Sequence, residues 1–303
     1  MFEMIKTQQK KRKFALTDNL VWILMAGCLM LRGGGVVGQM LTGYVPALIP
    51  AVSGTDAWIT GSIYLVFLGI WIVTLLVLVL IPRNRPILKA LGTKTKGNTP
   101  KMFAVGLGIG LGMNLLCALI AMLNGDIALT FHSFRPVSFL LVFMAVLIQS
   151  AAEELICRVY IYQRLVRRCG KPLVAAMVNA AFFALIHLGN TGVTYLALLN
   201  IFIYGLLFSA MVVYMDSPWA AMGAHAAWNF CQNIILGQPN SGTVLPYSVF
   251  KLDAAAAADS FAYSVSFGLE GTITTCALLL AVTGVIVWWG TKRKIVPTDI
   301  WTS

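Results

Sequence analysis

Charged residues are scarce in this sequence, and acidic ones are the scarcest. Only 11% of the 303 residues are charged and 11 are Asp or Glu, whereas 59% are hydrophobic. A soluble domain typically has about 25% charged residues. The composition therefore excludes an ordinary soluble domain and predicts an all-α, polytopic membrane protein.

Several metal-binding and hydrolytic motifs are also missing. The six cysteines form no CxxC pair and lie mostly in apolar segments, which is typical of small buried side chains and not of disulfides or metal ligands. The sequence has no HExxH helix, no GxGD of an intramembrane aspartyl protease and no GxSG serine of a rhomboid-type protease. Any hydrolytic chemistry must come from other residues.

Long apolar runs fill most of the chain. Because about 20 apolar helical residues cross a bilayer, we expect about eight transmembrane helices, near 20–49, 58–81, 102–123, 137–164, 172–189, 193–215, 217–236 and 270–290. Arg32 and three glycines interrupt the first, which predicts a kink or an incomplete span there.

Glycines and one long loop add two expectations. The third expected span contains two overlapping GxxxG patterns, which predict close helix packing, at Gly106, Gly108, Gly110 and Gly112. The longest outer loop, at 237–269, fits either an interfacial helix or a disordered tether.

Basic residues are placed asymmetrically around these spans. If the N-terminus is cytoplasmic, the inside segments hold all of the 22 Lys and Arg except Arg32, Arg135, Arg158 and Lys251. Positive residues favour the cytoplasmic side of a membrane. The pattern predicts a multi-pass protein of the cell membrane with both termini cytoplasmic. It also attributes the net charge of +11 to topology and not to nucleic-acid binding.

Two adjacent carboxylates lie well inside one apolar span. A charge there costs on the order of a few kcal/mol, so Glu153 and Glu154 indicate a function. Residues four apart share a helix face, so Arg158 should pair with Glu154 and point away from Glu153. Glu153 then lies one turn from Gln149 and suits a general base. The alternative is a polar cluster that only holds helices together.

Histidines occur in two other expected spans. His187 follows Phe183 by four residues, and His225 precedes Asn229 by four. A core histidine or an interhelical hydrogen bond are the plainer alternatives. Convergence on one intramembrane pocket is more economical, because it supplies a base for water and donors for an oxyanion. Two His and two Glu could also bind zinc, so a metal remains an alternative.

The order of these motifs resembles the CPBP family, the CAAX proteases and bacteriocin-processing enzymes also called the Abi family. The family pattern is EExxxR, then FxxxH, then HxxxN or HxxxD, on successive membrane helices. It is met here by Glu153-Glu154-xxx-Arg158, Phe183-xxx-His187 and His225-xxx-Asn229. The resemblance covers about residues 135–237 and includes the usual lead-in to the last motif, Ser217-Pro218-Trp219.

The resemblance implies an intramembrane endopeptidase that cleaves membrane-associated peptides or proteins. By position, Glu153 would activate water with assistance from His187, while His225 and Asn229 would stabilise the tetrahedral oxyanion. The implied supporting residues are Glu154, Arg158 and Phe183. The family has been described both as metalloproteases and as metal-independent glutamic proteases. We expect the latter, with no cofactor, and keep zinc as the alternative.

The resemblance also divides the chain. Residues 1–134 would form about three N-terminal spans, 135–237 the CPBP/Abi-like catalytic core, and 238–303 an extracytoplasmic loop with the last span and a basic cytoplasmic tail. The expected partners are the lipid bilayer and a membrane-associated peptide or protein substrate, and no nucleic acid. Nothing in the sequence assigns an oligomeric state.

Two other functions compete with the protease. Some members of the family act through binding partners, so a non-enzymatic bacteriocin-immunity factor or membrane scaffold is one alternative. A proton-coupled transporter would also explain intramembrane Glu and His, but the chain lacks the internal repeat of many transporters.

Overall fold

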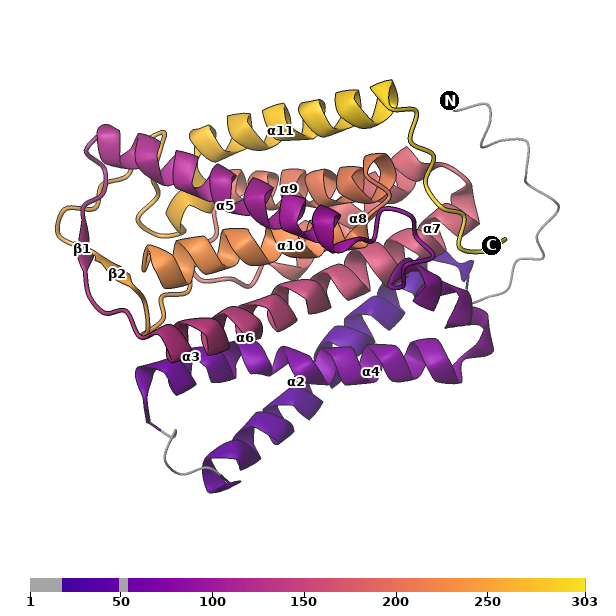
Figure 1. The fold of residues 1–303 in the computed structure, drawn as a ribbon, viewed down its shortest axis with the longest axis horizontal. Coiled ribbons are helices and arrows are strands. Elements are labelled where there is room, and N and C mark those ends of the chain that lie inside the picture. The colour runs from indigo at the N-terminus through magenta and orange to yellow at the C-terminus, as the bar shows by residue number, and fades with distance from the viewer. Residues whose placement is uncertain (1–17, 49–53, 303) are drawn as a thin grey trace.

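The computed structural model describes residues 18–48 and 54–302, and it is a helical bundle with one small sheet (Figure 1). The α-helices are α2 (Leu20–Leu48), α3 (Asp56–Leu65), α4 (Phe67–Leu80), α5 (Pro100–Leu123), α6 (Pro136–Glu154), α7 (Tyr162–Cys169), α8 (Pro172–Ile186), α9 (Tyr195–Tyr214), α10 (Pro218–Asn229) and α11 (Ile273–Lys292). Two π-helical segments continue α6 and α10, namely η4 (Leu155–Ile161) and η5 (Phe230–Ile235). The 3₁₀ helices are η3 (Pro82–Ala90) and η6 (Gly268–Gly271).

Six helical segments of the described chain are long and apolar enough to cross a bilayer. They are Leu20–Tyr44, Asp56–Leu80, Pro100–Leu123, Pro136–Cys169, Tyr195–Tyr214 and Ile273–Lys292. The predicted all-α, polytopic membrane protein is therefore confirmed, whereas the count of eight is not. The other two expected spans are α8, with 15 residues, and α10, with 12. An α-helix of 15 residues extends only about 22 Å, less than the roughly 30 Å of a hydrocarbon core.

Helix α10 lies inside the bundle. Its residues from Ala220 to Asn229 are all buried, and it packs against α5, α6 and α9 (Figure 1). A helix covered by other helices on every side does not need the length of a lipid-facing span. The motif residues His225 and Asn229 are consequently held in the interior of the protein.

Small residues allow α10 to approach α5 closely. A Cβ atom added to Gly106 or Gly110 would overlap the carbonyl oxygen of Ala220 or Ala224. The predicted close packing is thus confirmed for this pattern. Gly108 and Gly112 face open space, with no atom within 4 Å of an added Cβ, so the second pattern has no packing role in the described residues.

Helix α2 runs unbroken through Arg32 and the glycines that follow it. The expected incomplete span is therefore wrong, because Leu20–Tyr44 is long and apolar enough to cross a bilayer. The glycines instead permit a close crossing with α4, because a Cβ on Gly34 would lie 2.5 Å from the Cα of Ile70 and one on Gly38 would overlap Val66. The end of the first expected span at residue 49 and the basic N-terminal segment lie outside the described residues.

The loop at 237–269 is neither an interfacial helix nor a disordered tether. Strand β2 (Phe250–Leu252) pairs antiparallel with β1 (Leu129–Phe131), with Thr130 opposite Lys251. The run of alanines after Asp253 forms a turn and irregular chain. Side chains further along this loop are fully buried against the bundle, which anchors it, at Ala262, Tyr263 and Phe267.

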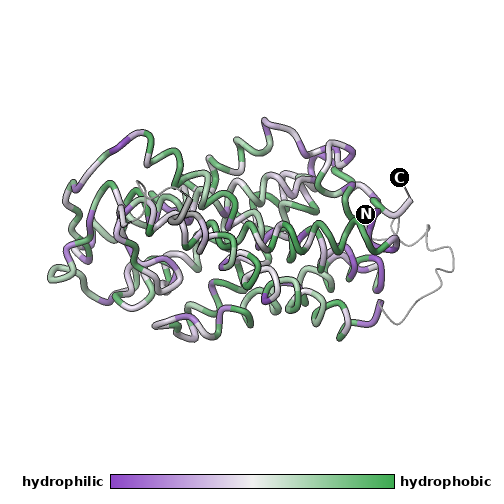
Figure 2. Tube along the Cα trace, turned by 90° about the horizontal axis from the view of Figure 1, so that it is seen from below, coloured by the Kyte–Doolittle hydropathy of each residue, from purple (hydrophilic) through white to green (hydrophobic). Residues whose placement is uncertain are grey.

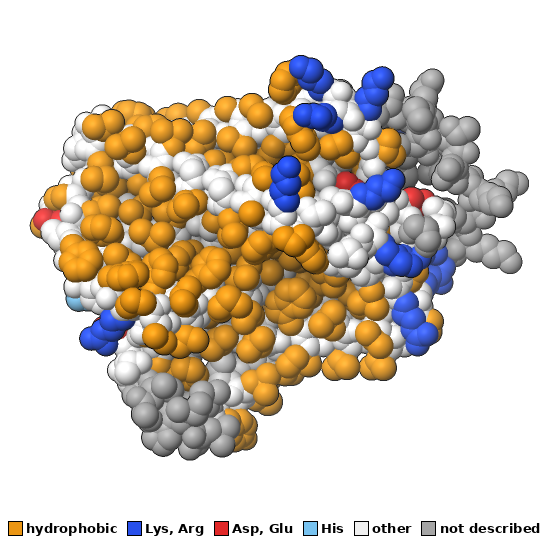
Figure 3. All heavy atoms as spheres, in the orientation of Figure 1, with side chains coloured by type: hydrophobic (Ala, Val, Ile, Leu, Met, Phe, Trp, Pro, Cys, Tyr) orange, Lys and Arg blue, Asp and Glu red, His pale blue; other side chains and the backbone are white. Residues whose placement is uncertain are grey.

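The molecular surface has an apolar middle and one basic end. Hydrophobic residues dominate the helices between the loops (Figure 2), and hydrophobic side chains cover most of the face in Figure 3. Lys and Arg gather at the end where α7 and the C-terminal segment lie (Figure 3). That end carries Arg83, Arg85 and Lys89 of η3, Arg164, Arg167 and Arg168 of α7, and Lys292 of α11.

Candidate active site

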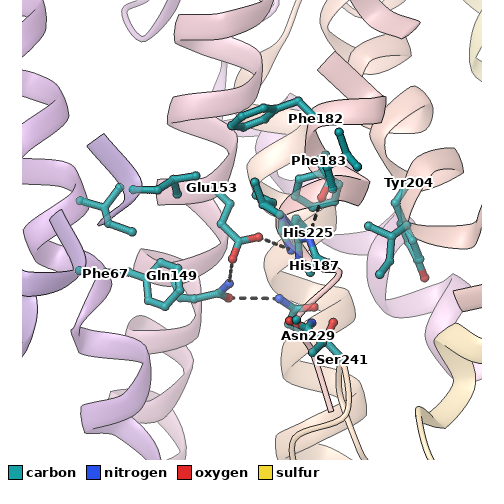
Figure 4. A pocket seen from close by; sticks show the side chains of 18 of the residues that line it. Phe67, Gln149, Glu153, Phe182, Phe183, His187, Tyr204, His225, Asn229 and Ser241 are labelled. Carbon is teal, nitrogen blue, oxygen red and sulfur yellow. Dashed lines mark hydrogen bonds and ion pairs between the residues drawn. The ribbon is translucent and has the colours of Figure 1, made fainter. Parts of the chain in front are cut away.

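One large cavity brings the motif residues together. Its volume is about 1220 Å³, and side chains from α2, α3, α4, α6, α8, α9 and α10 line it. Glu153, His187, His225 and Asn229 all contribute to its wall, and Figure 4 shows their polar groups facing one region. The cavity has mainly apolar walls otherwise, which is typical of a ligand site with a few orienting polar groups.

Glu153 lies near the end of α6 and has one oxygen free for chemistry. Gln149 Nε2 donates to Glu153 Oε1 at 2.7 Å, as the four-residue spacing predicts. Glu153 Oε2 faces His225 Nε2 at 3.7 Å, which is too long for a direct hydrogen bond. A gap of this length between two polar groups suits a water molecule that contacts both.

Glu154 is completely buried and pairs with two cationic or ionisable groups. Arg158 Nη1 donates to Glu154 Oε1 at 3.0 Å, so the expected ion pair is present. His225 Nδ1 lies 3.0 Å from the same oxygen. Arg158 is also fully buried, donates to the backbone oxygen of Gly205 at 3.2 Å, and lies over the ring of Phe183 at 4.5 Å. Phe183 thus packs against the guanidinium that neutralises Glu154.

The surroundings of His225 determine how its ring is protonated. A carboxylate accepts hydrogen bonds, so the contact with Glu154 places a proton on Nδ1. The other nitrogen, Nε2, then faces Glu153 and the cavity. Phe208 stacks on the ring at 5.1 Å with an interplanar angle of 20°. The ring is therefore fixed in orientation by Glu154 and Phe208.

His187 also lines the cavity, as predicted. It ends α8, and its Nδ1 lies 2.7 Å from the backbone oxygen of Phe183, which requires a proton on Nδ1. Its Nε2 is left for the cavity that it lines. Among the described residues, His187 lines the same cavity as Glu153 and His225 but makes no hydrogen bond with either.

Asn229 is held by a chain of amide hydrogen bonds. Asn240 Nδ2 donates to Asn229 Oδ1 at 3.1 Å. Asn229 Nδ2 donates at 3.1 Å both to Gln149 Oε1 and to Ser150 Oγ. Each amide therefore has one orientation, and the chain ends with Gln149 Nε2 donating to Glu153. The Asn229 amide expected to bind an oxyanion is occupied by this chain in the structure.

Glu270 is a second carboxylate in the cavity wall, besides Glu153, and no sequence motif pointed to it. Its Oε1 accepts from Trp228 Nε1 at 3.2 Å, and its Oε2 accepts from the backbone and hydroxyl of Ser241 at 2.7 and 2.9 Å. It lies in η6, outside the membrane-spanning segments. Burial raises the pKa of the Glu270 carboxyl, while the Ser241 hydrogen bonds and the nearby His187 and His225 act to lower it.

The polar chain from Glu270 to Glu153 connects the loop to the motifs. Ser241 donates to Glu270, and the residue before it in the chain, Asn240, donates to Asn229. No sequence motif includes Asn240, Ser241 or Glu270. The one sequence signal was the position of Glu270 at the start of the last apolar span, where an acid is unusual.

The site residues do not form a three-ligand metal site. Within the described ranges, no group of three His, Cys, Asp or Glu side chains could hold one ion. His225 Nδ1 is directed at Glu154 and His187 Nδ1 at a backbone oxygen, which leaves each ring one nitrogen. A histidine that binds zinc also donates its other ring N–H to a carboxylate or a backbone oxygen, so zinc stays the alternative to a metal-free site.

The sequence of this region matches one protein family. Residues 135–231 match the family described as Rce1-like, type II CAAX prenyl endopeptidase. No curated protein and no solved structure matches the chain. The matched residues contain all three motifs but neither Asn240 nor Glu270. The match confirms the resemblance to the CPBP family and points to protease activity on membrane-associated peptides or proteins. Through residues 135–231, this multi-pass membrane protein is similar to the Rce1-like type II CAAX prenyl endopeptidases of the CPBP family.

Proposed function

We propose that the protein is an intramembrane endopeptidase, resembling CAAX-processing proteases, that hydrolyses a peptide bond in its cavity. The observation that carries this proposal is the placement of Glu153 Oε2 and His225 Nε2 3.7 Å apart at the cavity wall. The addition of water to a carbonyl requires a general base next to the water and a hydrogen-bond donor next to the carbonyl oxygen, and these two residues can supply both. The family match supports the same reaction class.

Glu153 is the proposed general base. Gln149 occupies its Oε1, so Oε2 accepts the proton as the water oxygen bonds to the substrate carbonyl carbon. The same carboxyl then gives that proton to the leaving nitrogen as the carbon–nitrogen bond breaks. His187 Nε2 assists by accepting a hydrogen bond from the water, since its Nδ1 proton is fixed by Phe183.

His225 is the proposed main donor to the oxyanion. Glu154 holds the Nδ1 proton and so directs Nε2 to the cavity, where a proton on Nε2 would be donated to the negative oxygen. Asn229 contributes once one of its two amide hydrogens leaves Gln149 or Ser150. Glu154 and Arg158 act as positioning residues because both are fully buried behind the site. No metal or other cofactor takes part in the proposed reaction.

The orientation in the membrane is also a proposal. We place the basic end, which contains η3 and α7, at the cytoplasmic face of the cell membrane. The C-terminus lies at this end (Figure 1), and β1 and β2 lie at the opposite end. Both termini would then be cytoplasmic, and the loop at 237–269 would face outward.

The proposal is tested by profiling new peptide termini in membranes of cells with the wild-type protein or Glu153→Gln. The matched control is Asp56→Asn, the same kind of change at an exposed acid. Termini present with wild type and Asp56→Asn but absent with Glu153→Gln would support the protease and identify its substrate. Identical termini in all three, at equal protein abundance, would contradict it and favour a non-enzymatic immunity or scaffold protein.

A further inference from the structure

A tight turn at residues 240–243 forms part of the cavity wall. Asn240 N donates to Thr243 O at 3.0 Å, and Thr243 N donates to Asn240 O at 2.9 Å, which closes a two-residue turn between them. Both central residues have positive φ, 47° at Ser241 and 82° at Gly242. Glycine adopts such values freely, whereas the serine is strained there.

Glu270 holds the strained residue in place. The backbone N–H and the hydroxyl of Ser241 both donate to Glu270 Oε2, at 2.7 and 2.9 Å. Trp228 Nε1 donates to the other carboxyl oxygen at 3.2 Å, which fixes the orientation of the carboxyl group. Backbone strain persists where the surroundings enforce it, and it is frequent at functional sites. The turn therefore depends on Glu270 for its conformation.

The turn is connected to the proposed base by a hydrogen-bonded chain with one direction. Because the Glu153 carboxylate accepts hydrogen bonds, Gln149 presents Nε2 to it and Oε1 to Asn229 (Figure 4). Asn229 then presents Nδ2 to Gln149 and Oδ1 to Asn240, whose Nδ2 donates at 3.1 Å. Every donor in the chain thus points from the turn toward Glu153, and hydrogen bonds in such chains strengthen one another.

We propose that the turn at 240–243 is a positioning element of the proposed active site and that Glu270 keeps it in position. This inference rests on the proposed protease function. Asn240 fixes the amide of Asn229, which fixes Gln149, so that Glu153 Oε2 stays directed at the water. Asn240 and Glu270 act through these neighbours and are positioning residues.

Two readouts on the purified full chain in phosphatidylcholine nanodiscs test the proposal. Cleavage of a peptide that spans the bond identified by terminal profiling gives kcat and KM. The ¹⁵N signal of the Gln149 side-chain amide, identified by its absence from Gln149→Leu, reports on the hydrogen-bonded chain without any cleavage. The melting temperature is measured for each variant to detect a loss of stability.

Asn240→Ala removes the first donor of the chain. We expect kcat to fall about 3- to 10-fold, because one hydrogen bond contributes about that factor. KM and the melting temperature should stay at the wild-type values, and the Gln149 signal should shift. The matched control is Asn124→Ala, which removes an amide donor to Asp126 outside the cavity wall and should change none of these quantities.

Two variants of Ser241 test the conformation of the turn. Ser241→Gly and Ser241→Val both lose the hydroxyl and keep the backbone N–H that donates to Glu270. Glycine favours the positive φ of this position, whereas the β-branched valine disfavours it. We expect kcat of Ser241→Gly to exceed that of Ser241→Val by about 10-fold. Equal kcat values would overturn the role of the turn.

A double variant tests whether Glu270 acts through Asn240. The amide of Glu270→Gln has one acceptor oxygen and cannot accept from both Trp228 and Ser241, so kcat should fall. Two changes along one path are not additive. The double variant Glu270→Gln/Asn240→Ala should therefore be no slower than the slower single variant. Losses that multiply in the double variant would overturn the proposed role of Glu270.

The outcomes separate this inference from the protease function. An Asn240→Ala protein with wild-type kcat, or with an unshifted Gln149 signal, would overturn the positioning role and leave the protease standing. A fall in kcat together with a lower melting temperature would assign Asn240 to stability alone and would also overturn it. A Gln149 signal that shifts in Asn240→Ala, with no cleavage by wild type, would support the positioning chain and contradict the protease.

Discussion

The adjacent residues Glu153 and Glu154 have different surroundings although they share one helix end. Glu153 lines the cavity and leaves Oε2 free, whereas Glu154 is fully buried between Arg158 and His225. The difference follows from the 100° step between neighbours on a helix, which turns one side chain to the cavity and the other to the bundle. One residue can therefore react while the other fixes the histidine.

Removal of Arg158 should damage folding as well as activity. Arg158→Ala leaves the Glu154 carboxylate buried without its counter-ion, which typically costs about 3–5 kcal/mol. We expect lower yield and a lower melting temperature of the purified protein, measured by fluorescence, together with lower cleavage. Arg293→Ala, at an exposed position after α11, is the matched control and should change neither. An Arg158→Ala protein as stable as wild type would contradict the bracing role.

The Glu270 carboxyl should make stability depend on pH. Burial raises its pKa above the ordinary value of 4.5, so the folded protein binds this proton more tightly than the unfolded chain. The resulting stabilisation is full below pH 4.5 and is lost as the pH rises through the raised pKa. The Glu270→Gln side chain does not titrate, so this variant should not lose stability in this way as the pH rises.

This dependence is measured as melting temperature between about pH 4 and pH 8. Relative to Glu270→Gln, the wild-type melting temperature should fall as the pH increases over this window, and Asp56→Asn should follow wild type. Parallel curves for wild type and Glu270→Gln would show that Glu270 titrates at the same pH in the folded and unfolded protein.

At the scale of elements, two helices change their winding next to the site. α6 passes into η4 after Glu154, and α10 passes into η5 after Asn229. The wider π turn shifts the register of all residues that follow, and such turns are common at functional sites. The sequence motifs place the polar residues on helices, but an average helical period cannot locate these turns, because a π turn depends on tertiary contacts.

The α5–α10 contact should be sensitive to one glycine pattern and not to the other. Gly106→Ala forces a Cβ into the carbonyl of Ala220, and overpacking of this kind typically costs about 1–3 kcal/mol. Because α10 holds His225, we expect both a lower melting temperature and weaker cleavage. Gly108→Ala, on the same helix with open space around it, is the control and should be as stable as wild type. Equal effects of the two changes would contradict the assigned packing.

At the scale of the whole molecule, composition was sufficient for the fold class but not for the number of spans. The apolar run at 217–236 reads as a lipid-facing span, yet α10 is covered by α5, α6 and α9. Hydropathy does not distinguish burial in protein from burial in lipid, because both select apolar side chains. The expected helix at 217–236 is present as α10 and η5, but for that reason its apolar sequence did not show that it lies inside the bundle.

The motifs predicted the centre of the site better than its rim. Spacing of four residues correctly paired Glu154 with Arg158 and Gln149 with Glu153. Asn240 and Glu270 reach the site through a long loop and a 3₁₀ turn, and their contacts span long distances in the sequence. No local period encodes such contacts, and only the folded chain reveals them.

The central claim is that Glu153 activates water for peptide hydrolysis in the membrane. The most direct measurement uses purified protein in liposomes, a peptide containing the cleavage site found by terminal profiling, and buffer made with ¹⁸O-water. We expect wild type to place one ¹⁸O atom in the new C-terminal carboxylate. Glu153→Gln should give no product over the same time while it melts at the wild-type temperature. A Glu153→Gln protein that releases the labelled product at the wild-type rate would contradict the account.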